Sequence, residues 1–119
     1  MISAALLALA VAFGAFGAHA LKTHLSAEML QVWKTAVDYH FYHALGLLLI
    51  GVLAIALPGV SFKWSAIFLT AGIFLFSGSL YIMALSGVKW LGAITPIGGI
   101  SFILGWIMLF VAVWKKFPV

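Results

Sequence analysis

The stretch GLLLIGVLAIALPG, from Gly46 to Gly59, decides the fold of this chain. It is apolar until Pro58 and Gly59, a pair that ends a helix and begins a turn. The apolar character continues back to about Thr35, and a membrane-spanning helix needs about 20 mostly apolar residues. The stretch therefore predicts a transmembrane helix over residues 35–57.

The composition of the whole chain also indicates an integral membrane protein. Of its 119 residues, 66% are hydrophobic and only 7% are charged, whereas average proteins carry about 25% charged residues. The net charge of +4 comes from scattered lysines, which disfavours a nucleic-acid partner because such binding needs a clustered basic face. Cysteine is absent, which removes disulfides, thiolate metal sites and cysteine nucleophiles.

Three further apolar stretches predict three more spans, over residues 1–21, 64–86 and 95–115. We expect Thr95 to cap the last helix and Pro96 to be its first residue.

The stretch Ala18-His19-Ala20 resembles a signal-peptide cleavage site, but no positive side chain precedes the apolar run, so we expect the first span to be retained. The fold class is all-α: an integral membrane four-helix bundle that forms a single transmembrane domain over residues 1–119.

The segment between the first two spans has an amphipathic pattern. Met29, Leu30 and Trp33 are apolar, whereas Gln31 and Lys34 are polar. We expect a short interfacial helix that lies on the membrane surface and runs into the second span. Asp38 is expected to pair with Lys34, one helical turn earlier, at that surface.

The polar residues are concentrated in one half of the predicted bundle, because all four histidines and both acids lie between His19 and His43. His19 continues an alanine stripe on a helix rich in small residues. Such a helix is usually central in a bundle, so we expect His19 to point inward. The side chains of His19, His43 and Tyr81 should then lie within a helix–helix spacing of about 8–10 Å.

These considerations define two sets of candidate residues. The first set is a polar pocket in the loop-side half of the bundle, lined by His19, His40, His43, Ser79, Tyr81 and Thr95. The second set consists of glycines at helix contacts, namely Gly14, Gly17, Gly78, Gly98 and Gly99.

Four motifs in order resemble the YgdD/YwdK-type family, small bacterial inner-membrane proteins of uncharacterised function with relatives in animals. The motifs are GAFGAH, YHFYHALGLL, SGSLY and TPIGG, and they are spread over the whole chain. The resemblance implies four transmembrane helices, a multi-pass location in the inner membrane and termini in the cytoplasm. It implies no reaction, because none is established for the family.

Several functions remain open at this stage. No nucleophile has a recognisable base and orienting group, so we expect no enzyme. We expect a small binding or accessory component whose polar pocket accepts a lipid headgroup, a quinone or another small polar-ended molecule. The alternatives are a small-solute transporter or channel subunit and then a metal- or haem-binding protein, with His19 and His43 as candidate ligands. The cofactor is left open, and the expected partners are the bilayer and either a second copy or another membrane protein.

Overall fold

The computed structural model describes residues 1–118, and every regular element in that range is helical. Four helical stretches are long and apolar enough to span a membrane, as the sequence predicted: residues 2–19, 27–56, 63–86 and 89–116. The elements in chain order are α1 (Ile2–His19), η1 (Leu21–Thr23), α2 (Ala27–Ala56), α3 (Lys63–Gly72), η2 (Ile73–Gly78), α4 (Ser79–Ser86), η3 (Lys89–Ala93) and α5 (Thr95–Lys116).

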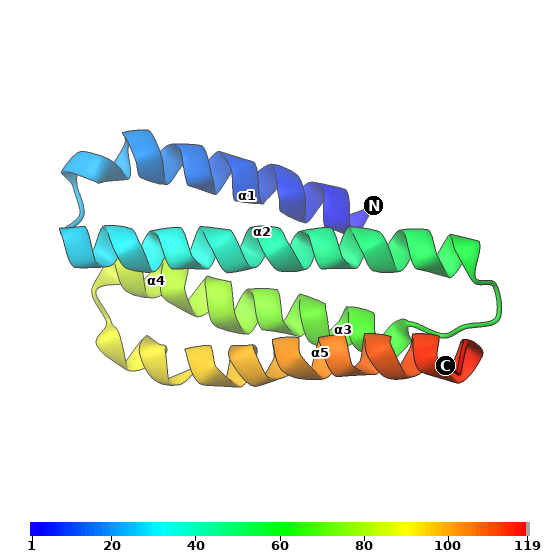
Figure 1. Cartoon of the computed structure of the whole chain (residues 1–119). Helices are drawn as coiled ribbons and strands as arrows, with labels where there is room; N and C mark the ends of the chain where they lie inside the picture. The colour runs from blue at the N-terminus through cyan, green and yellow to red at the C-terminus, as the bar shows by residue number, and fades with distance from the viewer. Residues whose placement is uncertain (119) are drawn as a thin grey trace.

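The helices form an elongated bundle of 51 × 26 × 21 Å in which α2 is central (Figure 1). Helix α1 packs along one side of α2, and α3, α4 and α5 lie on its other side. Both termini and the α2–α3 turn lie at one end, here called the termini end, whereas η1 and η3 lie at the other, the loop end. The expectation that the first span is central was wrong, because its alanine stripe is exposed.

Helix α2 is one continuous helix of 30 residues. The Ser26 hydroxyl accepts a hydrogen bond from the Met29 amide at 3.2 Å, and Glu28 lies in the first turn, so the helix is capped and favoured electrostatically from Ala27 onward. No glycine or proline interrupts residues 27–45. The separate interfacial helix that we expected before the second span is therefore absent, since its residues are the first turns of α2.

The third span contains a π-helical segment, η2, between α3 and α4. Helix α5 packs along this span, and two serines form hydrogen bonds between them. The Ser65 hydroxyl donates to the Gly105 carbonyl at 2.8 Å, and the Ser101 hydroxyl donates to the Phe68 carbonyl at 2.6 Å. Such bonds between helices contribute about 0.6 kcal/mol each in membrane proteins.

Helix α5 begins one residue earlier than expected, with Ile94 at the capping position and Pro96 in the first turn. The Thr95 side chain does not cap the helix. Its hydroxyl lies instead 2.8 Å from the Ser79 hydroxyl, so it joins the start of α5 to the start of α4.

The tightest helix approach occurs at Gly98, where a Cβ would overlap the backbone of Phe76 in η2. Gly17 is also at a close contact, with the Trp33 ring, whereas a Cβ at Gly14 would lie 3.4 Å from Val37. A Cβ at Gly78 would meet nothing within 4 Å, and one at Gly99 would lie 3.9 Å from Phe76, so these two glycines are not at close contacts. Three close contacts were not foreseen, at Gly46, Gly72 and Gly105.

We predict that Gly98→Ala lowers the free energy of unfolding by about 3 kcal/mol, because the added methyl group meets backbone atoms that cannot rotate away. Unfolding of the purified protein by SDS titration in detergent measures this. Gly78→Ala is the matched control and should change the stability by less than about 1 kcal/mol. Equal effects of the two substitutions would contradict the close approach of α5 to η2.

Candidate functional site

Trp33 fixes how α1 lies on α2. Its indole Nε1 donates a hydrogen bond to the Phe13 carbonyl at 2.8 Å, and its ring covers Gly17, where a Cβ would lie 2.5 Å from Cδ1. Trp33 is only 4% exposed. It is therefore a buried contact residue between the two helices.

His19 does not meet the other histidines. Because Gly17 faces Trp33 and Gly14 faces Val37, His43 lies level with the first half of α1, and the end of α1 is roughly 18 Å away along the bundle. His19 is exposed there. The interpretation that it points into the bundle was wrong because another face of α1, with Leu6, Ala10 and Gly17, is the buried one. The two histidines also differ in depth, because α2 begins about two turns earlier than expected and His43 lies near the middle of that helix.

Four of the other predicted pocket residues form two pairs. The Nδ1 atom of His40 lies 2.9 Å from the Tyr81 hydroxyl, and the hydroxyl groups of Ser79 and Thr95 lie 2.8 Å apart. Phe13 and Trp33 enclose Tyr81, with ring centroids 5.0 and 4.7 Å away. These polar groups therefore hydrogen-bond to one another inside the bundle. Within residues 1–118, the one buried side-chain nitrogen or oxygen without a hydrogen bond is His40 Nε2.

His43 packs on another side of α2. Its Nδ1 donates to the Tyr39 carbonyl at 2.6 Å, and its ring stacks on Phe102 with centroids 3.4 Å apart. His19 and His43 are too far apart along the bundle to share a metal ion. In the part of the chain that the structure describes, no three histidine, aspartate or glutamate residues come together in a possible metal site.

A groove between α1 and α2 opens near the loop end and has a volume of about 490 Å³. Small and apolar residues line it together with three charged residues. We call it the α1–α2 groove, and it is lined by Gly14, Gly17, Ala18, Lys22, Leu30, Trp33, Lys34, Val37 and Asp38.

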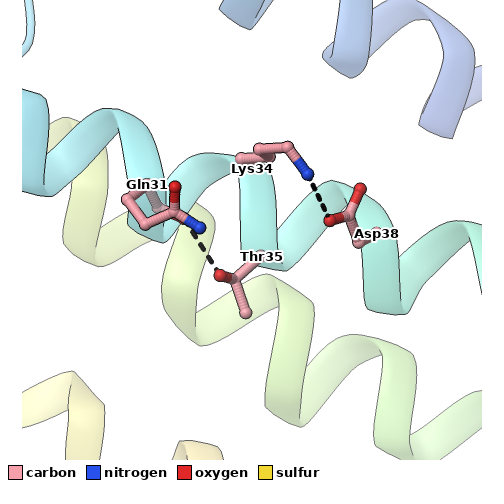
Figure 2. A network of polar contacts seen from close by, with 4 residues as sticks. All are labelled: Gln31, Lys34, Thr35 and Asp38. Carbon is pink, nitrogen blue, oxygen red and sulfur yellow. Dashed lines mark hydrogen bonds and ion pairs between the residues drawn. The ribbon is translucent and has the colours of Figure 1, made fainter.

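Two of the residues that line this groove, Lys34 and Asp38, form an ion pair, which Figure 2 shows. The Lys34 Nζ is 2.7 Å from Asp38 Oδ2, which confirms the pairing expected from the sequence. Asp38 follows Val37, whose methyl group lies beside Gly14, and Gly14 is roughly 8 Å below the end of α1. The pair therefore lies deeper along the bundle than the surface position that we expected.

The groove was not foreseen from the sequence, because the alanine stripe was expected to be the face of α1 that packs in the bundle. The buried residues of α1 are Leu6, Ala10 and Gly17, with Phe13 half-buried between them. Their spacing of three or four residues is the pattern of a helix face. A mixture of large and small residues at that spacing was the sequence signal that could have identified the buried face of α1.

We predict that Tyr81→Phe lowers the free energy of unfolding by about 1 kcal/mol, because it leaves the buried His40 Nδ1 without its partner. Tyr42→Phe is the matched control, since Tyr42 is 59% exposed. His19→Ala should also leave stability unchanged. An SDS titration that shows no difference between the two tyrosine variants would contradict the His40–Tyr81 pair.

Comparison with known proteins agrees with the resemblance seen in the sequence. Residues 13–99 match the family described as "Protein of unknown function (DUF423)". The chain is 53% identical over 108 residues to the UPF0382 membrane protein YwdK of Bacillus subtilis, covering 90% of this chain and 88% of that protein. It is 50% identical over 107 residues to a UPF0382 membrane protein of Staphylococcus saprophyticus, covering 90% and 88%. No solved structure matches the chain. The chain belongs to the DUF423 family of membrane proteins, whose function is uncharacterised.

Proposed function

We propose that this protein is a non-enzymatic binding or accessory component of the membrane that holds an amphiphile with an anionic headgroup in the α1–α2 groove. One observation carries the proposal: Lys34 and Asp38 line an otherwise apolar groove, and their neighbours Trp33 and Val37 lie against the last turns of α1, at Gly17 and Gly14. Helix α1 has 18 residues, or about 27 Å, which is close to the thickness of the hydrocarbon core.

Charge at this depth favours a polar occupant. Ionisable groups inside a membrane are costly beside lipid tails and are functional candidates by default. The Lys34–Asp38 pair neutralises part of that cost, but the side chains remain 65% and 37% exposed. A headgroup that reaches into the groove would provide further hydrogen bonds to both.

The charges and walls of the groove also indicate the class of ligand. Two lysines, Lys22 and Lys34, and one acid, Asp38, are among the residues that line the groove, so its lining carries an excess of one positive charge and suits an anion. Leu30, Trp33 and Val37 provide apolar contacts for the part of the ligand next to its headgroup. The volume of about 490 Å³ is within the usual range for ligand pockets, about 300–1,000 Å³.

A transporter is the second candidate, and the position of Asp38 favours it. Ion-coupled transport commonly uses a carboxylate within the membrane, and Asp38 lies below the end of α1 beside Gly14 and Val37. We also propose that the chain forms a single domain and that it lies in the inner membrane. Its termini are cytoplasmic in this proposal, an orientation that the two lysines at the end of α5 favour.

We predict that Ala18→Phe reduces the binding of amphiphiles that co-purify with the protein by at least tenfold, because the new ring fills the groove. Native mass spectrometry of protein taken directly from membranes measures the bound species. Ala15→Phe is the matched control: Ala15 is also exposed on α1 but does not line the groove. The binding proposal fails if both variants carry the same bound molecules as the parent protein.

Transport is tested by measuring solute and proton flux in proteoliposomes that contain the parent chain or Asp38→Asn. The binding proposal expects no flux from either protein. Flux that Asp38→Asn abolishes would replace it with the transporter.

A further inference from the structure

A cavity lies at the termini end of the bundle, whereas the α1–α2 groove opens near the loop end. It has a volume of about 390 Å³ and is formed where the α2–α3 turn, the start of α3 and the end of α5 meet. Its walls combine apolar and cationic side chains, including Ser61, Trp64, Met108, Ala112, Lys115 and Lys116. We call it the termini hollow.

Two lysines line the termini hollow, and a third lies next to one of its lining residues. Lys115 and Lys116 line it from the end of α5. Lys63, at the start of α3, lies over the ring of Trp64, with its Nζ 5.8 Å from the ring centroid. The acidic side chains of the sequence, Glu28 and Asp38, are both in the first half of α2, which begins at the loop end. No acidic side chain therefore competes for these three lysines.

The start of α3 adds backbone donors to the same place. No side chain caps this helix, so the first amide N–H groups have no partner within the helix and point toward its N-terminal end. Trp64 and Ser65, in that first turn, line the hollow. An anion in the hollow would be close to both the lysines and the positive end of the α3 dipole.

The apolar walls identify the source of the anion as a lipid. Met108, Val111 and Ala112 form a wall on α5, and Phe110 and Trp114 of the same helix are exposed on the bundle surface. A free phosphate ion would gain nothing from these contacts, whereas the glycerol and upper acyl carbons of a phospholipid would cover them.

We infer that the termini hollow binds the phosphodiester headgroup of an anionic phospholipid in the leaflet that surrounds the termini. Lys115 and Lys116 bind the phosphate, and the α5 wall receives the glycerol. This inference does not depend on the α1–α2 groove, because the two sites share no residue.

The test is native mass spectrometry of the full chain in detergent, with phosphatidylglycerol and phosphatidylcholine added in equal amounts. The parent protein should retain phosphatidylglycerol preferentially. Lys115→Gln with Lys116→Gln should bind it about thirtyfold more weakly at this site, since each lysine near anionic lipid contributes about 1 kcal/mol. Arginine at both positions should restore binding.

All variants carry Ala18→Phe, which fills the α1–α2 groove, so that the bound phosphatidylglycerol reports the termini hollow alone. Lys89→Gln is the control, because Lys89 lies at the loop end and lines neither site; it should leave phosphatidylglycerol binding intact. Unchanged binding in the Lys115→Gln, Lys116→Gln variant, or equal retention of the two lipids by the parent protein, would overturn the inference. Displacement of the lipid by millimolar inorganic phosphate would show that the site selects a soluble anion instead.

Discussion

The contact of Trp33 with α1 is the interaction on which the rest of this structure depends. Inside a bilayer, helices gain little from the hydrophobic effect, so close packing and hydrogen bonds hold them together. Gly17 provides the space for the indole ring, and the Phe13 carbonyl accepts its hydrogen bond at 2.8 Å. A shift of α1 by one turn would lose both contacts at once. The register of α1 on α2 is therefore fixed.

That register explains which polar groups are available to a ligand. It places Tyr81 and His40 behind Phe13 and Trp33, where the two side chains bond to each other at 2.9 Å. Ser65 and Ser101 also hydrogen-bond inside the bundle, and each donates to a backbone carbonyl of a neighbouring helix. Lys34 and Asp38, in contrast, lie at the edge of an open groove. The polar residues inside the bundle thus hydrogen-bond to other parts of the bundle, whereas Lys34 and Asp38 pair with each other and remain partly exposed.

The sequence predicted the spans well and the site poorly, for physical reasons. Apolar length alone identifies a span, and a spacing of four residues alone identified the Lys34–Asp38 pair. Rotation of a helix is harder to predict in a membrane, because a lipid-facing side and a protein-facing side are both apolar. Alanines on α1 therefore looked like a packing face, and His19 was placed inside the bundle. The start of α2 depended on whether residues 27–35 joined the next span, and the Ser26 cap and the lack of glycine or proline after it were the signals for one continuous helix.

A disulfide cross-link tests the α1–α2 register most directly. The chain contains no cysteine, so two introduced cysteines can react only with each other within one molecule. Gly14→Cys with Val37→Cys should form a disulfide readily in the membrane, because a Cβ at Gly14 would lie 3.4 Å from the Val37 side chain. His19→Cys with His43→Cys should form none. A disulfide in the second pair and not in the first would contradict the register, and with it the groove and the depth of its ion pair.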